Sequence, residues 1–116
     1  MPVVTTQHFE ITVRETPGGM LHVCLAGDFD MGVGNALADA LAAAAARSGV
    51  RGVQVDLSRT TFLDSHGIAG LVAGYEAAHR AGHRLTVVNC HGLVRDVLRV
   101  TGLLEVLTGS AEPAAG

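Results

Sequence analysis

The sequence predicts a single α/β domain with a mixed, mostly parallel sheet of four to five strands, an antiparallel N-terminal strand and three to four helices. The chain has 116 residues, which is the size of one domain. From residue 20 onward, strand-type and helix-type hydrophobic patterns alternate, which favours parallel strands joined by right-handed helical crossovers. We expect the domain, 1–116, to have its core at about 8–108 and a flexible tail at 110–116.

The first two strands are predicted to form a hairpin. Apolar residues fall on every second position of two short runs, as in half-buried strands. The runs are separated by Thr-Pro-Gly-Gly at 16–19, a strong turn signal. The apolar residues of the two runs are Phe9, Ile11, Val13, Leu21, Val23 and Leu25.

After the hairpin, apolar residues at i, i+3 and i+4 spacing predict helices, and short apolar runs predict strands. A polar break at 58–61 is expected to end the third strand. In chain order the expected elements are a helix from 33 to about 47, a strand at 50–57, a helix from 68 to about 82, a strand at 85–88, a helix from 93 to about 102 and a short terminal strand at 103–107.

The composition favours a compact, aliphatic core and narrows the functional classes. Apolar residues make up 48% of the chain, but there is no Trp, one Tyr and three Phe. With a net charge of −3 and no basic tract, the chain lacks the surface that nucleic-acid binding needs. Cys24 and Cys90 are too few for a disulfide framework and are expected to be reduced, buried thiols. No signal peptide is expected, because the N-terminus has no basic region followed by an apolar stretch. No membrane span is expected, because the weakly polar stretch 36–46 is too short, so we expect a cytoplasmic protein.

Ser65 is the residue for which the sequence suggests a chemical role, because it lies where a strand and a short loop give way to a helix. A hydrolase nucleophile is disfavoured, since Leu63 stands where the G-x-S-x-G pattern needs its first glycine. Either Asp64 or Ser65 can cap the helix. The third role is phosphorylation, because a helix N-terminus favours added negative charge and a dianion on a contact surface blocks docking.

A family resemblance favours the third role. The stretch 62–68, Phe-Leu-Asp-Ser-His-Gly-Ile, resembles the signature of STAS domains, in particular the SpoIIAA-like anti-sigma factor antagonists. That signature is an apolar pair followed by Asp-Ser, a small residue, Gly and an aliphatic residue. The resemblance covers about residues 9–108, and its other matching pieces are 25–30, 55–57, 85–89 and 97–103.

The resemblance implies a bacterial phosphoprotein that acts by partner switching and is not an enzyme. The unphosphorylated protein would bind an anti-sigma factor that is also a serine kinase, and so regulate transcription. Phosphorylation of Ser65 would end binding, and a PP2C-type phosphatase would reset the switch. No cofactor and no direct contact with nucleic acid or membrane is implied, and a weak homodimer is allowed.

The resemblance also suggests which residues contact the partner. Carboxylates at the ends of neighbouring strands could meet basic groups on the kinase, although turn and cap roles also explain them. His66 departs from the small residue of the pattern, and we expect it to stabilise phosphorylated Ser65 through an ion pair. The expected partner-binding residues are Asp28, Asp30, Asp64, His66, Gly67 and Ile68.

Alternatives remain open at this stage. One is a STAS scaffold or subunit without a Ser65 switch, such as a stressosome component or the partner of a lipid-transport ABC complex. Another is a nucleotide-binding regulator, although the chain has no phosphate-binding glycine loop. His79 and His83 have the spacing of a zinc pair, but Gly82 interrupts the helix between them and no third ligand is evident, so no metal site is expected.

Overall fold

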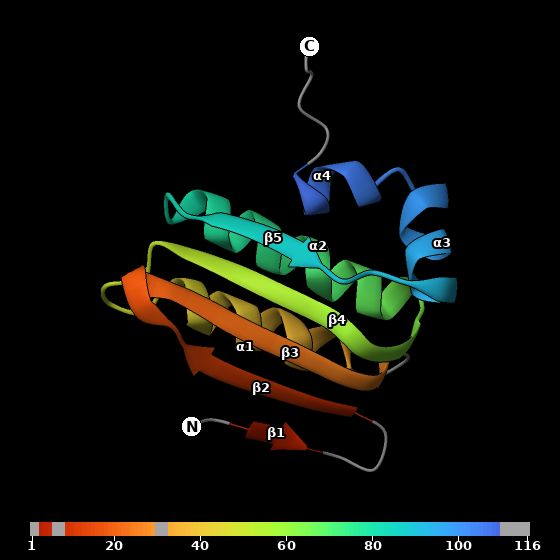
Figure 1. Ribbon diagram of the computed structural model, residues 1–116, viewed down its shortest axis with the longest axis horizontal. Coiled ribbons are helices and arrows are strands. Elements are labelled where there is room, and N and C mark those ends of the chain that lie inside the picture. The colour runs from red at the N-terminus through yellow and green to blue at the C-terminus, as the bar shows by residue number, and fades with distance from the viewer. Residues whose placement is uncertain (1–2, 6–8, 30–32, 110–116) are drawn as a thin grey trace.

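The computed structural model describes residues 3–5, 9–29 and 33–109. Within them, five strands form one sheet in the order β1-β2-β3-β4-β5 (Figure 1). The β1–β2 and β2–β3 pairs are antiparallel, whereas β3–β4 and β4–β5 are parallel. The strands are β1 (Val3–Thr5), β2 (Phe9–Glu15), β3 (Met20–Phe29), β4 (Gly52–Leu63) and β5 (Arg84–Val88).

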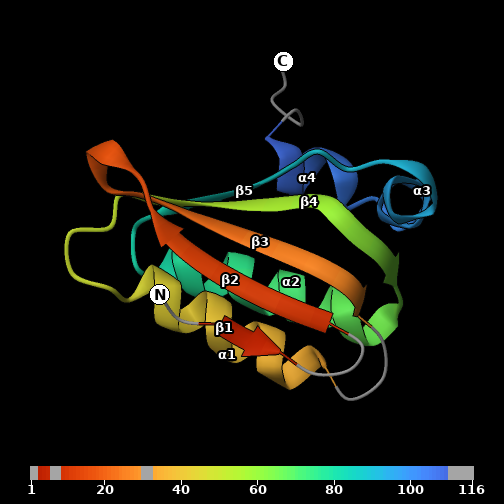
Figure 2. The same cartoon turned by 60° about the horizontal axis from the view of Figure 1, so that its bottom comes forward.

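Four α-helices accompany the sheet within the described residues. The helices are α1 (Gly34–Ala45), α2 (Ser65–Arg80), α3 (Gly92–Val100) and α4 (Leu104–Thr108). Helices α1 and α2 cover one face of the sheet, and α3 and α4 lie beside β4 and β5 on the other side (Figure 2). The predicted α/β class is confirmed. The two types of strand pairing are equal in number, because β1, which the sequence did not predict, adds an antiparallel pair.

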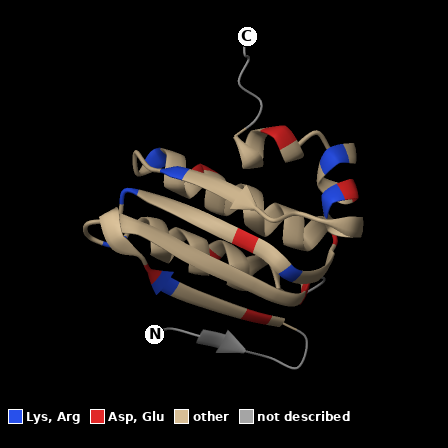
Figure 3. Cartoon of the chain, in the orientation of Figure 1, with Lys and Arg blue, Asp and Glu red and all other residues tan. Residues whose placement is uncertain are grey.

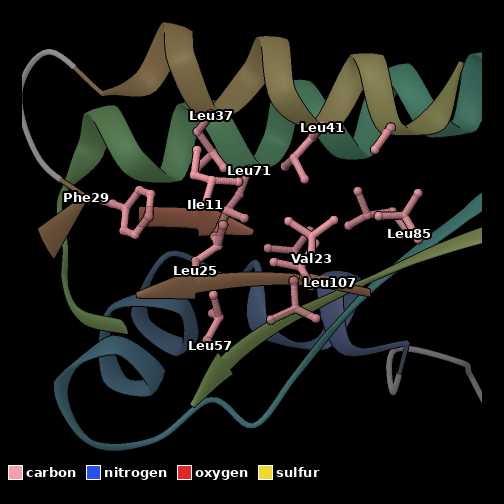
Figure 4. Close-up of a cluster of buried hydrophobic side chains, with 14 of the residues drawn as sticks. Ile11, Val23, Leu25, Phe29, Leu37, Leu41, Leu57, Leu71, Leu85 and Leu107 are labelled. Carbon is pink, nitrogen blue, oxygen red and sulfur yellow. The ribbon is translucent and has the colours of Figure 1, made fainter. Parts of the chain in front are cut away.

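The predicted hairpin is confirmed by the pairing of β2 with β3, in which Ile11 faces Leu25 and Val13 faces Val23. A short 3-10 turn, Pro17–Gly19, joins the strands. Their apolar side chains meet those of α1 and α2 in an aliphatic core (Figure 4). Among the core residues Ile11, Val23, Leu25, Leu37, Leu41 and Leu71 are at most 1% exposed.

The predicted polar break at 58–61 is wrong, because β4 continues through it to Leu63. The extension pairs with the second half of β3, which supplies backbone partners across a register shift. Exposed polar side chains here point to solvent, but Thr60 is fully buried. Its hydroxyl donates a hydrogen bond of 2.7 Å to the Leu25 carbonyl oxygen, so the polar group is satisfied inside the domain.

The predicted terminal strand at 103–107 is also wrong, because Leu104–Thr108 forms the helix α4. The Leu103 N–H bonds back to the Leu98 carbonyl oxygen, which turns the chain over the end of α3. From there Leu103, Leu104 and Leu107 pack onto the core at helical spacing, and Leu107 is 1% exposed. A short apolar run does not by itself distinguish a strand from a helix.

Helices α1 and α2 pack unusually closely, because α2 presents glycines to α1. A Cβ at Gly74 would lie 2.6 Å from Leu41 Cβ, and one at Gly70 would lie 2.8 Å from the Gly34 carbonyl oxygen. Both distances are below normal van der Waals contact. The close approach fixes α2, and with it the start of the helix at Ser65, against the rest of the domain.

Candidate functional site

The start of α2 is organised by Asp64, which is the N-cap residue and has extended backbone geometry. Its Oδ1 accepts hydrogen bonds from the backbone N–H of His66 at 2.8 Å and of Gly67 at 3.2 Å. The sequence allowed either Asp64 or Ser65 as the N-cap residue of this helix, and in the structure the N-cap is Asp64. Ser65 is therefore the first residue of the helix proper.

The Ser65 side chain is exposed. Within the described part of the chain, no hydrogen bond engages its hydroxyl. The hydroxyl thus lies at the positive end of a helix of 16 residues without a structural task. This arrangement leaves the group available to a reagent or an enzyme from solution.

Asp64 is held in its charged form. Desolvation raises the pKa of Asp64, but hydrogen bonds from the Gly67 and His66 N–H groups and from the His66 side chain outweigh it, so the pKa is lowered. The His66 ring is exposed, with Nδ1 3.5 Å from Asp64 Oδ2. His66 also borders an open groove of about 390 Å³ between α1 and α2, lined by small residues such as Ala38 and Ala69.

The ends of β3 and β4 meet the start of α2. Asp28 pairs with Phe62 across the two strands, and the Asp64 N–H donates to the Phe29 carbonyl oxygen at 3.2 Å. The Thr61 hydroxyl donates to Asp28 Oδ1. The structure therefore places Asp28 and Asp64 at the same end of the sheet, where β3 and β4 finish, as expected. Asp30 lies outside the described residues.

Two of the expected partner-binding residues are engaged inside the domain. Gly67 is buried, and a Cβ there would meet the Phe29 carbonyl oxygen and lie 2.6 Å from Leu63 Cδ1. Its close packing is thus against the sheet. Ile68 is half-buried and packs on the core. Partner contact by either residue stays a prediction.

Phe62 is a candidate that sequence reasoning did not single out. Its side chain is 39% exposed, beside Asp28 in the strand register. The signal was available, because Leu63 is buried and the next residue back along a strand faces the opposite way. Phe62 thus places an exposed aromatic ring at the end of β4, beside Asp28 in the strand register.

A second polar cluster, which the sequence also missed, lies on the strands away from Ser65. Asp56 Oδ1 accepts from Asn89 Nδ2 at 3.1 Å and from the Ser58 N–H at 2.8 Å, and Oδ2 lies 3.3 Å from His22 Nε2. Desolvation raises the pKa of Asp56, but these hydrogen bonds and the nearby His22 lower it on balance. The cluster ties β3, β4 and the end of β5 together.

Cys24, Cys90, His79 and His83 show no arrangement that would mark a chemical site. Cys24 and Cys90 are free thiols, as expected, but they are partly buried rather than buried, and desolvation raises the pKa of each. His79 is exposed and His83 half-buried. Across the described residues, no group of three or more His, Cys, Asp or Glu side chains is placed to hold a metal ion. None of the described helices is long and apolar enough to cross a membrane.

Comparison with known families identifies the class of protein. Residues 12–108 match the family described as "Mlab, STAS domain". The chain therefore belongs to the STAS-domain family, as the residues around Ser65 suggested. A search of curated protein sequences returned no significant match.

Solved structures support the same assignment. An anti-sigma factor antagonist from Mycobacterium paratuberculosis is 29% identical, with a TM-score of 0.73 over 85% of this chain and 82% of that one. The anti-sigma factor antagonist SpoIIAA in its unphosphorylated form is 18% identical, with a TM-score of 0.70 over 81% and 82% of the two chains. Its phosphorylated form, from Bacillus, is 17% identical, with a TM-score of 0.64 over 80% and 84%. The murine anion transporter Slc26a9 is 19% identical, with a TM-score of 0.67, over 78% of this chain but 15% of the transporter.

Proposed function

We propose that this STAS domain is an anti-sigma factor antagonist, a binding module rather than an enzyme. It binds an anti-sigma factor that is also a serine kinase, and phosphorylation of Ser65 ends the binding. The observation that carries the proposal is the free, exposed Ser65 hydroxyl beside a cap that Asp64 provides. The similarity to the antagonist from Mycobacterium paratuberculosis supports it.

The surrounding surface explains how phosphate would act. A phosphoserine carries about 1.5 to 2 negative charges at neutral pH, so the formal net charge of −3 would change to about −5. The added charge would directly follow Asp64, close to the ends of β3 and β4 that carry Asp28 and the exposed Phe62 ring. Docking would then require a partner to desolvate a dianion over an apolar contact.

The test is incubation of the chain with ATP and the anti-sigma kinase encoded in the same organism, followed by mass spectrometry and binding measurements. We expect phosphate on Ser65, binding by wild type and Ser65→Ala, and loss of binding by Ser65→Asp. Ser48 is an exposed serine distant in sequence, and Ser48→Asp is the matched control that keeps binding. Equal binding by all variants would refute the switch.

His66 has a further role in this proposal, which is to stabilise the phosphorylated state. Its ring lies next to the cap, one residue from the phosphate acceptor, where a protonated imidazole would form an ion pair with the phosphate. We expect His66→Ala to speed dephosphorylation by a PP2C-type phosphatase, whereas His79→Ala at the other end of α2 does not. An unchanged rate for His66→Ala would rule the role out. The proposed partners act in the bacterial cytoplasm, and location there is part of the proposal.

The second candidate is a STAS scaffold or subunit of a larger complex, such as a stressosome or a lipid-transport ABC complex. The matching family is described as "Mlab, STAS domain", and this description is the observation that supports the second candidate. This function predicts stable association with a dissimilar partner whatever the state of Ser65. The same binding series therefore separates the two functions.

A further inference from the structure

A second surface lies at the opposite end of α2 from Ser65. It is an open groove of about 570 Å³, which we call the β5-edge groove. It is lined by Tyr75 and His79 of α2, by Arg84 and Thr86 of β5 and by Val106 of α4. Helix α2 covers one face of the sheet and α4 lies beside β5 (Figure 1), so a groove lined by both runs along the outer side of β5.

The strand that lines this groove lies at an edge of the sheet. Within the described residues, β5 is the last strand and pairs only with β4. In the described part of the chain, no backbone hydrogen bond other than the β4 ladder involves Arg84–Val88. An edge strand with unpaired N–H and C=O groups is a template for an added strand. β5 also contains no proline and no bulge that would blunt its edge.

The side chains of the groove indicate the chemistry of an occupant. Among the described residues, no acidic side chain lines it, whereas Arg84, His79 and His83 do. Basic residues mark the end of α2 and the start of β5 (Figure 3). Arg84 is exposed and makes no ion pair within the described residues, and Val106 is a 41% exposed apolar side chain. The groove therefore suits a strand that carries a carboxylate and an apolar residue. A second copy of the chain would offer the sequence of β5 itself, Arg-Leu-Thr-Val-Val, which has no carboxylate.

We propose that the β5-edge groove binds an extended, acidic peptide segment of another protein as a sixth strand of the sheet. Backbone pairing with β5 supplies the affinity, and the contact of a carboxylate with Arg84 sets the specificity. His79 follows Ser65 by fourteen residues, roughly 20 Å along the helix. The groove is therefore a docking site separate from the Ser65 surface, and both can be occupied at once.

The test uses the full chain and a phage-displayed library of random nine-residue peptides, with counter-selection on Arg84→Glu. We expect selected peptides to be acidic, and synthetic copies to shift the amide NMR signals of Leu85–Val88 and slow their hydrogen exchange. Arg84→Glu should weaken binding by about tenfold or more, since attraction becomes repulsion. Val106→Asp should weaken it too. Arg95→Glu, on the exposed surface of α3, and Ser65→Asp are controls that should leave binding unchanged.

Backbone pairing is tested with peptides N-methylated on alternate residues, first on one edge of the strand and then on the other. We expect methylation of one edge to abolish binding and methylation of the other to be tolerated. The proposal is overturned if both methylated peptides bind normally, or if no selected peptide depends on Arg84. It is also overturned if free glutamate alone reproduces the shifts, or if the chain forms a dimer through β5. A result that refutes the proposed Ser65 switch would not contradict peptide binding at this groove, because peptide binding is measured without the kinase.

Discussion

The substitution Gly74→Ala tests the close packing of α1 on α2. Alanine has the higher helix propensity by about 1 kcal/mol, so it would stabilise an isolated helix. Here its Cβ would lie 2.6 Å from Leu41 Cβ and 3.0 Å from Leu41 Cγ, well inside the optimum of about 3.5–4.0 Å. Overpacking of this kind costs about 1–3 kcal/mol. Because the contact is severe, we expect a net loss of about 2 kcal/mol, or about 8 °C in melting temperature for a domain of this size.

Removal of the opposing side chain should reverse the sign of the effect. Leu41→Gly removes the Cβ, Cγ and Cδ1 atoms that the new Cβ would meet. Alone it creates a cavity that costs about 2–5 kcal/mol, and glycine in a helix costs about 1 kcal/mol more. In that background the new Cβ has room, so Gly74→Ala should stabilise the domain by about 1 kcal/mol through helix propensity. Urea denaturation of the four proteins of this double-mutant cycle measures both effects. If Gly74→Ala changes the free energy of unfolding by the same amount in both backgrounds, the close approach does not determine the stability of this helix pair.

Three further substitutions test the site and the extended β4 strand. Asp64→Asn keeps a capping side chain but removes its charge. Folding lowers the pKa of Asp64, so the charged carboxylate stabilises the fold at any pH above the unfolded pKa of about 3.9. The melting temperature of wild type should therefore exceed that of Asp64→Asn near neutral pH. This difference should disappear as the pH falls through the lowered pKa of the folded state. An advantage that persists at pH 2 would contradict this assignment. Thr60→Val removes the hydroxyl that donates to the buried Leu25 carbonyl oxygen, and it should lower the free energy of unfolding in urea by about 1–2 kcal/mol. The control Ser48→Ala, at an exposed position, should lower it by less than about 0.5 kcal/mol. Equal losses for the two variants would contradict the role of the hydrogen bond. Ser65→Ala should melt within about 2 °C of wild type, because the cap is Asp64, and a larger drop would mean that the hydroxyl has a structural role.

Local patterns were sufficient to predict most of the fold. The period of two around Ile11 and Val23 and the helical spacing around Leu37 and Leu71 predict the hairpin and the helices correctly, because each pattern depends on one buried face. The errors fall where pairing decides the structure. The segment at 58–61 looks polar, yet it is a strand, since β3 offers it a partner 35 residues away at Leu25.

In the candidate site, too, contacts between neighbours in the chain could be predicted, whereas contacts between distant strands could not. Asp64, Ser65 and His66 are neighbours in the chain, so their proximity at a helix start could be predicted. The contact of Thr61 with Asp28 and the cluster of Asp56 with His22 depend on the register of strands more than thirty residues apart, which single-sequence patterns do not determine. The exposed edge of β5 likewise depends on which strand ends the sheet.

The separation of the cap from the free hydroxyl has a consequence for how such a protein can evolve. Because Asp64 alone holds the first turn of α2, the next position carries no folding requirement and can change to almost any polar residue. A lineage could therefore acquire, lose or permanently mimic the phosphorylated state by one substitution at residue 65 while the domain remains equally stable. Under the function proposed for Ser65, regulation and folding would therefore be inherited independently.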